Sequence, residues 1–391
     1  MPIHISKRCF VAALLAVGLL HASRASGDEP TFAEIVAAAK QIEAVGGRVN
    51  VAWEPSPPNI RINPYSRRQY VLSQDLKAGE VVDLIRFRNG PDQPEGLFGD
   101  QSKPEDWPAK RSVRDSDLKA LSYFPKLEYL TLSECQIGDA GLAEVKSLQA
   151  LVSLDLDGTP VTDAGLDHLQ GLKKLRYLRL ARTKVTDAGL KKMPPSPDLS
   201  DLDLSGTAIT DAGLANLKGV PLTTLNLEKT RITNAGLKHL LLLPELSTLR
   251  LDGTAITDDG LKTIARLPQL RWLTLDRTQV SDAGLAHLRQ AKKLTLLSLE
   301  DLAVTDAGLR ALIGIPGLTS LYLEGTQVTD AGMQHVAAHP DLWELSLRRT
   351  KVTDAGLSKL AGLKKLKFVY VDESKVTEEG LKRLEAQLQL Q

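Results

Sequence analysis

Val161-Thr162-Asp163-Ala164-Gly165-Leu166 is one copy of a stretch that recurs through most of this chain. The same six residues return unchanged at 185–190, 304–309 and 352–357, and altered copies occur seven more times between residues 137 and 381. The copies are 24 residues apart, with a single interval of 23, as their glycines show: Gly141, Gly165, Gly189, Gly213, Gly236, Gly260, Gly284, Gly308, Gly332, Gly356 and Gly380. Eleven copies at one period predict a stacked solenoid, because each unit buries its apolar side only against its neighbours.

A second pattern, Leu-x-x-Leu-x-Leu-x-x-Thr, repeats at the same period, as in Leu151, Leu154, Leu156 and Thr159. Alternation of leucine with polar residues predicts a short strand whose leucines face inward. Stacked repeats then give a parallel sheet with strands about 4.8 Å apart. The threonine that follows each strand is expected to satisfy backbone groups in the turn with its hydroxyl.

The Thr-Asp pair of each copy is expected to start a helix, with either residue as the N-cap. A glycine in a helical turn costs about 1 kcal/mol relative to alanine, so its presence in every copy indicates close approach to the next repeat. Helices are about 10 Å wide, more than twice the strand spacing. The stack is therefore predicted to curve into an arc with a concave parallel sheet and convex helices.

The repeat Leu-x-x-Leu-x-Leu-x-x-Thr/Cys-x-Val/Ile-Thr-Asp-Ala-Gly-Leu resembles the cysteine-containing (F-box-like, ribonuclease-inhibitor-like) subtype of leucine-rich repeats over about residues 113–385. Cys135 keeps the residue that names the subtype, whereas other copies have Thr, Leu302 or Ser374 in its place. Together with an export signal, the repeats look like those of secreted planctomycete-type bacterial proteins. The resemblance implies an α/β solenoid and a protein-binding function. No F-box pattern precedes the array, so a ubiquitin-ligase role is not implied.

The residues before the array predict two further segments. Residues 1–25 have the basic, apolar and small-residue regions of a secretory signal peptide. Residues 26–111 are predicted to form an N-terminal helical and irregular cap: a helix of about 14 residues from Phe32, a strand at Arg48 to Trp53, a degenerate first repeat with its strand at 82–87, and a proline-rich insertion at 89–110. The array of about eleven repeats then occupies residues 112–391.

The signal predicts an exported protein, in the periplasm, the cell envelope or outside the cell. A retained N-terminal anchor is the alternative, although twelve apolar residues from Cys9 to Leu20 are too few to span roughly 30 Å of hydrocarbon. After cleavage Cys135 is the one cysteine left, so no internal disulfide is expected. Cys135 occupies the threonine position of its repeat, which predicts a small buried residue; a reactive thiol is the alternative.

The sequence contains no recognisable catalytic pattern. It has no Ser/His/Asp grouping, phosphate-binding glycine loop or paired-cysteine motif. His168, His239, His287 and His335 share one helical position but never in adjacent repeats, too far apart to ligate one zinc ion. We expect no enzyme activity, no metal and no cofactor, and a formal net charge of +1 gives no reason to expect a nucleic acid partner. Lysine pairs such as Lys173-Lys174 are expected to solvate the rim, with an anionic partner as the alternative.

The outward positions of the predicted strands carry a surplus of acidic residues. Five of them occupy one position in five consecutive repeats: Glu228, Asp252, Asp276, Glu300 and Glu324. Like charges on neighbouring strands repel, so folding alone does not favour this arrangement. Aromatic residues gather toward the C-terminal half of the same face: Trp272, Tyr322, Trp343, Phe368 and Tyr370. Aromatic side chains beside charge are typical of protein-binding surfaces.

We therefore expect a non-catalytic scaffold that binds a protein or peptide, cationic in character, on its acidic and aromatic concave face. Three alternatives stay open for that face: a merely solvated surface, with Lys229 and Arg277 relieving the repulsion, a calcium-binding ladder, or no role because the partner binds elsewhere. Two alternatives concern the whole protein. It could be a cell-envelope component that assembles with itself, or an accessory subunit of an envelope enzyme.

Overall fold

The computed structural model describes residues 37–38, 48–52, 81–86, 113–194 and 196–389; of residues 48–52, 81–86 and 389 it describes the backbone alone. Contacts divide the chain into two compact units, Met1–Leu175 and Arg176–Gln391. Each unit is built from strands that follow one another in sequence order, with short helices between them.

The first unit has four described strands. β1 (Arg48–Ala52) is antiparallel to β2 (Val81–Arg86), and β2 is parallel to β3 (Tyr129–Thr131), which is parallel to β4 (Ser153–Asp155). The strand predicted from Arg48 and the strand of the degenerate first repeat are therefore confirmed. The helices of this unit are η3 (Asp115–Tyr123), α4 (Asp139–Val145) and η4 (Gly165–Leu169).

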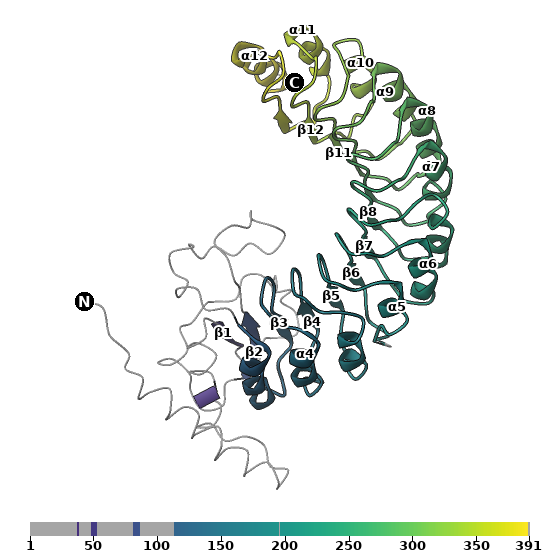
Figure 1. The fold of residues 1–391 in the computed structure, drawn as a ribbon. Coiled ribbons are helices and arrows are strands. Elements are labelled where there is room, and N and C mark those ends of the chain that lie inside the picture. The colour runs from purple at the N-terminus through teal and green to yellow at the C-terminus, as the bar shows by residue number, and fades with distance from the viewer. Residues whose placement is uncertain (1–36, 39–47, 53–80, 87–112, 195, 390–391) are drawn as a thin grey trace, which may run out of the picture. The chain divides into compact units, whose positions relative to one another are not determined.

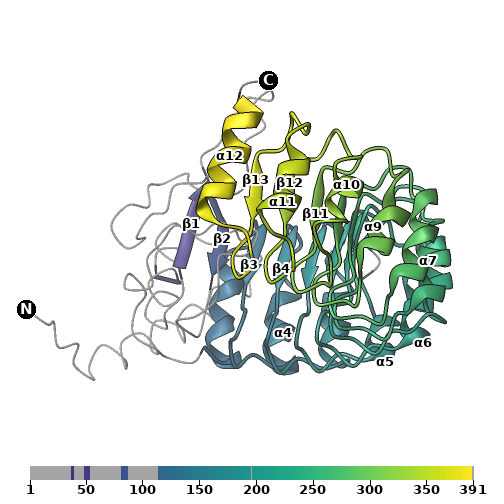
Figure 2. The ribbon, with the colours of Figure 1, turned by 90° about the horizontal axis from the view of Figure 1, so that it is seen from above.

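The second unit stacks nine parallel strands: β5 (Tyr177–Arg179), β6 (Asp201–Asp203), β7 (Thr224–Asn226), β8 (Thr248–Arg250), β9 (Trp272–Thr274), β10 (Leu296–Ser298), β11 (Ser320–Tyr322), β12 (Glu344–Ser346) and β13 (Phe368–Tyr370). The segments between them form α5 (Asp187–Leu190), α6 (Asp211–Leu214), η5 (Ala215–Leu217), η6 (Leu237–Leu242), α7 (Asp258–Ile264), α8 (Asp282–Leu285), η7 (Ala286–Gln290), α9 (Asp306–Leu312), α10 (Met333–Val336), α11 (Asp354–Leu357) and η8 (Ser358–Leu360). The longer α12 (Glu378–Gln389) follows β13 and packs beside α11 (Figure 2).

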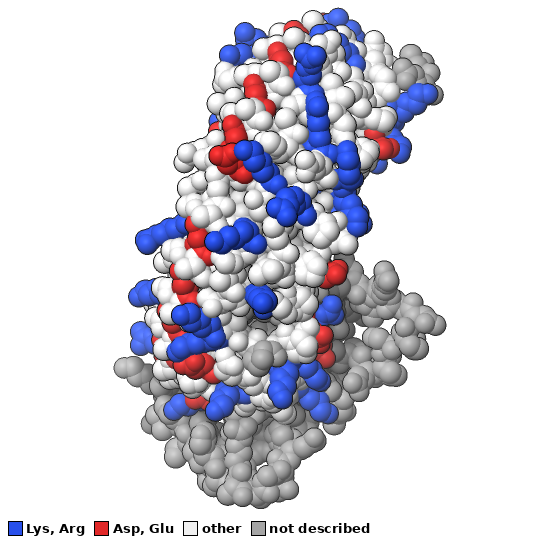
Figure 3. Space-filling view, turned by 90° about the vertical axis from the view of Figure 1, so that its right-hand side faces the viewer, with Lys and Arg blue, Asp and Glu red and all other residues white. Residues whose placement is uncertain are grey.

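Within residues 176–391 the strands line the inner side of a curve and the helices its outer side (Figure 1). The predicted concave parallel sheet and convex helices are thus confirmed for this unit. Its core is made of the repeated leucines: in the repeat of β8, Leu246, Leu249 and Leu251 are all 0% exposed. The helical side carries acidic side chains in a line along the repeats, with lysines and arginines beside it (Figure 3).

Each strand ends in the same tight turn. Eight threonines donate their hydroxyl to the carbonyl oxygen three residues earlier over 2.5–2.7 Å, as predicted: Thr159, Thr183, Thr207, Thr230, Thr254, Thr278, Thr326 and Thr350. The residue before each threonine has a positive φ, whether it is a glycine such as Gly253 (65°) or an arginine such as Arg277 (54°). Non-glycine residues rarely adopt this conformation, so the turn imposes it at a conformational cost.

The aspartates of the Thr-Asp pairs act differently from prediction. Threonine is the N-cap, since Thr305 accepts a hydrogen bond from the amide of Ala307. The aspartate before it in the stack, Asp282, instead accepts two hydrogen bonds from Thr305, from its amide (2.8 Å) and its hydroxyl (2.5 Å). Each aspartate thus joins its repeat to the next one. Of the two residues predicted as possible N-caps, threonine is confirmed and aspartate is not the cap.

We call this set of inter-repeat contacts the aspartate ladder. Its members accept hydrogen bonds from the threonine or serine one repeat later: Asp139, Asp187, Asp211, Asn234, Asp258, Asp282, Asp306, Asp330 and Asp354. Asn234 is the natural exception to aspartate. Its Oδ1 accepts from the amide of Thr257 at 3.1 Å and its Nδ2 donates to the Thr257 hydroxyl at 2.7 Å.

The ladder also explains the repeated glycine. A Cβ at Gly260 would lie 2.5 Å from Oδ1 of Asn234 and 2.9 Å from Cγ2 of Ile256. The same clash with the preceding aspartate recurs at the other glycines of this position, for example at Gly308 with Asp282. The predicted close approach between repeats is therefore confirmed, and the neighbour is a ladder side chain.

Several sequence-based predictions fall outside the described residues. These are the signal peptide at 1–25, most of the helix predicted from Phe32, and the proline-rich insertion at 89–110. No helix in the described part of the chain combines the length and apolar character needed to cross a bilayer.

Candidate functional site

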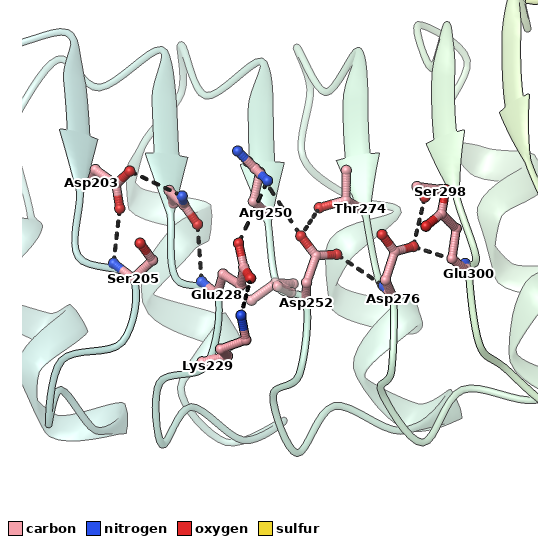
Figure 4. Close-up of polar contacts among 12 residues, drawn as sticks. Asp203, Ser205, Glu228, Lys229, Arg250, Asp252, Thr274, Asp276, Ser298 and Glu300 are labelled. Atoms are coloured by element: carbon pink, nitrogen blue, oxygen red, sulfur yellow. Dashed lines mark hydrogen bonds and ion pairs between the residues drawn. The ribbon is translucent and has the colours of Figure 1, made fainter. Parts of the chain in front are cut away.

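The inner side of the second unit presents three side-chain positions per repeat. In the repeat of β9 these are Trp272, Thr274 and Asp276, which follow alternate residues of the strand and its exit. The third position contains the five consecutive acids predicted from the sequence, and we call Glu228, Asp252, Asp276, Glu300 and Glu324 the acidic column. Four strand spacings separate its ends, about 19 Å. Figure 4 shows its first four carboxylates side by side along the turns that leave β7 to β10.

The N-terminal end of the acidic column is neutralised by basic residues. Glu228 lies 2.8 Å from Nζ of Lys229 and 3.5 Å from Arg250, and Arg250 also lies 3.8 Å from Asp252 (Figure 4). These ion pairs are partly exposed, and such pairs contribute about 0.2–1 kcal/mol each. They nevertheless leave little net negative charge at Glu228.

Asp252 is buried and hydrogen-bonded within the protein, so little of its side chain reaches the surface. It is 3% exposed, and its carboxylate accepts from the Thr274 hydroxyl at 2.6 Å and from the Asp276 amide at 2.9 Å. Burial raises its pKa, while these hydrogen bonds and Arg250 lower it. The position of Asp252 in the repeat could not distinguish it from the partly exposed acids of the same column.

Asp276 and Glu300 form the part of the acidic column without an ion pair among the described residues. Asp276 accepts from the Ser298 hydroxyl (2.6 Å) and from the Glu300 amide (2.8 Å), as Figure 4 shows. Burial, with a contribution from Asp252, raises its pKa to about 6. For Glu300, burial and the charges of Asp276 and Glu324 raise the pKa to about 7.

The C-terminal end of the column is tied to an arginine that sequence reasoning did not select. Arg349 donates to Glu324 at 3.1 Å and, two repeats back, to Asp301 at 2.8 Å. Arg277 reaches the same Asp301 at 3.5 Å. The contact between Arg349 and Asp301 could not be predicted from neighbouring repeats, because the two residues are 48 positions, or two repeats, apart.

The structure separates the predicted aromatic residues into three places. Trp272 is 48% exposed and shares its repeat with Asp276; in the strand register it lies beside Leu296. Trp343 and Phe368 are 43% and 38% exposed and touch edge to face, with ring centroids 4.6 Å apart. Four strand spacings separate Trp272 in β9 from Phe368 in β13, so the two side chains cannot form one cluster.

Tyr322 and Tyr370 belong to a third group around Glu344. Burial is the largest cause that raises the pKa of both hydroxyls, and a hydrogen bond to Glu344 contributes to each. Arg348 lies over the Tyr370 ring, 5.2 Å from its centroid, and donates to Asp372 at 2.7 Å. Glu344 thus contacts both tyrosines, and Tyr370 also has the basic neighbour Arg348.

Cys135 and the histidines were also considered from the sequence. Cys135 is fully buried, as predicted, and burial raises the pKa of its thiol to about 12, which keeps it unreactive near neutral pH. Among the described residues, no three His, Cys, Asp or Glu side chains are grouped closely enough to hold a metal ion.

A family model described as a leucine-rich repeat region matches residues 134–388. The chain belongs to the leucine-rich repeat family. Members of this family commonly serve as protein-binding scaffolds and are typically non-catalytic. A comparison with curated protein sequences gives no significant match.

Three solved structures are similar to this chain at low sequence identity. An internalin from Listeria monocytogenes is 20% identical, with a TM-score of 0.48 over 74% of this chain and 89% of its own. A leucine-rich repeat protein of Leptospira interrogans is 18% identical, with a TM-score of 0.47 over 69% of this chain and 79% of its own. Mouse RP105, in complex with MD-1, is 19% identical, with a TM-score of 0.49 over 68% of this chain and 45% of its own.

Proposed function

We propose that this leucine-rich repeat protein is a non-catalytic scaffold that binds a cationic protein or peptide on the strand side of residues 176–391. The observation that carries the proposal is the pair Asp276 and Glu300. Both carboxylates are partly buried, adjacent and without an ion pair in the described part of the chain. Burial and then the charges of neighbouring acids raise the pKa of each, and the charge of Arg277 offsets this only in part.

An ionised pair of this kind destabilises the free protein, because neither charge is fully solvated and each repels the other. A lysine or arginine of a partner would restore the missing counter-charge. Glu228 and Glu324 already have basic neighbours, and Asp252 is buried. The partner's cationic group is therefore directed to the middle of the acidic column.

Trp272 is the most exposed large apolar side chain in the described part of the chain. It is exposed, occupies the same repeat as Asp276, and lies about 13 Å along the strand direction from it, four residues at 3.3 Å each. Leu296 extends the apolar surface into the next repeat. A peptide with a basic residue near an apolar one fits both positions. Trp343, Phe368, Tyr322 and Tyr370 would contact a longer or folded partner.

Kinetic measurements with paired peptides test this proposal. A short peptide with two lysines near a leucine should bind, and its counterpart with glutamine in place of lysine should not. Asp276→Asn combined with Glu300→Gln should lower the on-rate at low salt and flatten its salt dependence, whereas Trp272→Ala should mainly raise the off-rate.

Asp282→Asn provides the matched control, since it removes one negative charge from the helical side. Binding by this variant should equal that of the wild type. Equal binding of the lysine and glutamine peptides, or a lysine peptide that is indifferent to the double amide change, would refute the acidic pair as the binding site.

The same proposal covers the regions before the array. We propose that residues 1–25 direct export, so that the protein acts in the periplasm, the cell envelope or outside the cell, and that residues 26–111 cap the first repeat. The cysteine at position 135 and the threonine-rich turns favour the cysteine-containing repeat subtype and a planctomycete-type source. Self-assembly in the envelope, or service as an enzyme's accessory subunit, is the alternative function.

A further inference from the structure

The apolar side chains of the last repeat in the second unit are more exposed to solvent than their equivalents in the repeat before it. In the repeat of β12, Leu345, Leu347, Val352 and Leu357 are each 0% exposed. Their equivalents 24 residues later are partly exposed: Val369, Val371, Val376 and Leu381. A solenoid end with apolar residues of this kind needs a covering partner or a polar cap.

At the same edge, two backbone amides that follow β13 lack a partner in the described part of the chain. In inner repeats the two amides that follow the strand donate to the next strand, as Leu347 does to Tyr370 (2.7 Å) and Arg349 to Asp372 (3.1 Å). The equivalent amides of Val371 and Glu373 have no acceptor among the described residues. An open strand edge of this kind accepts a further strand.

We propose that β13 pairs with β13 of a second copy of this chain, antiparallel about a two-fold axis through Tyr370. The charges at the edge favour a second copy, because Lys367 precedes the strand, Glu373 follows it and both are exposed. Antiparallel pairing brings Lys367 of each copy opposite Glu373 of the other. An interface about a two-fold axis requires this self-complementarity.

The backbone fixes the register of the pairing. Every second residue of β13 points its amide and carbonyl groups toward the open edge. Val369 and Val371 are two such residues. In the proposed register Val369 of one copy lies opposite Val371 of the other. The two-fold axis generates two such pairs, and each pair exchanges two hydrogen bonds. A shift by two residues toward the C-terminus would instead oppose Lys367 with Lys375, which is unfavourable. The chosen register leaves the acidic column outside the interface.

Charge reversal tests the pairing without touching the core. Sedimentation velocity over a concentration series should show a reversible dimer of the full chain. Lys367→Glu and Glu373→Lys should each weaken dimerisation about tenfold, since two symmetric pairs become like-charged. The double variant should restore it. Lysine fits this backbone conformation, because Lys229 occupies the same position with a φ of 53°.

Arg271→Glu is the control, since Arg271 has the position of Lys367 in an inner repeat; dimerisation should be unchanged. A monomer at all concentrations, or a double variant no tighter than the singles, would overturn the proposal.

Cross-linking tests the register directly. In the proposed pairing Tyr370 faces its own copy across the axis as a non-hydrogen-bonded pair, with Cα atoms about 4.5 Å apart, within disulfide range. Oxidised Tyr370→Cys should therefore become a covalent dimer, whereas Tyr322→Cys, at the same position in β11, should stay monomeric in denaturing gels. Equal cross-linking of the two variants would contradict the register. Peptide binding by Lys367→Glu should be unchanged. Dimerisation and peptide binding are therefore measured independently, so one proposal can fail while the other holds.

Discussion

The aspartate ladder and the acidic column both place one acidic or amide side chain in successive repeats, but on opposite sides of the sheet. Each ladder side chain is satisfied by the next repeat, as Asp282 is by the amide and hydroxyl of Thr305. Asp276 of the acidic column also accepts hydrogen bonds from the next repeat, from the Ser298 hydroxyl and the Glu300 amide. Burial and neighbouring carboxylates nevertheless raise the pKa of both Asp276 and Glu300. Acidic side chains repeated along a solenoid can therefore join its repeats, as in the ladder, or also oppose folding where they are buried beside one another.

The requirements of folding explain the acidic residues of the aspartate ladder, but they do not explain the acidic residues in the middle of the acidic column. The ladder stabilises the stack, so its recurrence needs no ligand. The raised pKa values of Asp276 and Glu300 predict a stability cost in the free protein, and the proposed cationic partner would remove it, as expected where function conflicts with folding.

The largest expected effect is at the glycine that makes room for the ladder. Gly260→Ala should lower the free energy of unfolding by about 2–3 kcal/mol, because its Cβ would overlap Asn234 and Ile256. Gly362→Ala should be near neutral, since no atom lies within 4 Å of its Cβ position. Urea denaturation of both variants measures this difference, and a neutral Gly260→Ala would mean that the ladder yields to a methyl group.

The next effect separates the ladder's geometry from its charge. Asp282→Ala should cost about 2 kcal/mol, since two hydrogen bonds from Thr305 are lost at about 1 kcal/mol each. Asp282→Asn should cost less than 1 kcal/mol, because Asn234 makes the equivalent pair of contacts in its own repeat. Equal losses in the two variants would indicate that the carboxylate charge itself matters.

The smallest effect has the opposite sign and lies in the acidic column. The pKa of Glu300 rises from 4.5 to about 7 on folding. Between these pH values the folded protein keeps a proton that the unfolded chain releases, so the free energy of unfolding falls as the pH rises. Glu300→Gln should therefore stabilise the protein by about 1 kcal/mol at pH 8, after allowance for solvent screening, and leave it unchanged at pH 4.

Thermal unfolding of Glu300→Gln at the two pH values provides the measurement, with Asp282→Asn alongside. The ladder variant should show no stabilisation at pH 8. A Glu300→Gln variant that is less stable than the wild type at pH 8 would show that the carboxylate contributes to folding.

The sequence predicted the repeat architecture because leucine, threonine and glycine each have one structural role here. Leu249, Thr254 and Gly260 occupy the places expected for a strand core, a turn and a close contact. The aspartates were misassigned because an N-cap and an inter-repeat acceptor require the same residue type at the same point. Only the position of the next repeat distinguishes the two roles.

The candidate site was less predictable for a related reason. The acidic column was read as five equivalent charges, yet burial removes Asp252 from the surface, and Arg349 pairs with Glu324 while it also reaches across two repeats to Asp301. Likewise, Trp272 and Phe368 share a strand position but lie four strands apart. The burial of each side chain, and the distance over which a long side chain such as arginine can make contact, decide which residues of a column can bind a partner. A repeat pattern specifies neither.

Proton release on binding tests the central claim most directly. Calorimetric titration of the lysine peptide at pH 6.5, in two buffers with different protonation enthalpies, measures it. A cation beside Asp276 and Glu300 favours their ionised forms, so the wild type should release a fraction of a proton per peptide bound. The Asp276→Asn/Glu300→Gln variant should release none. Binding without proton release by the wild type, or with the same release by the variant, would contradict the account.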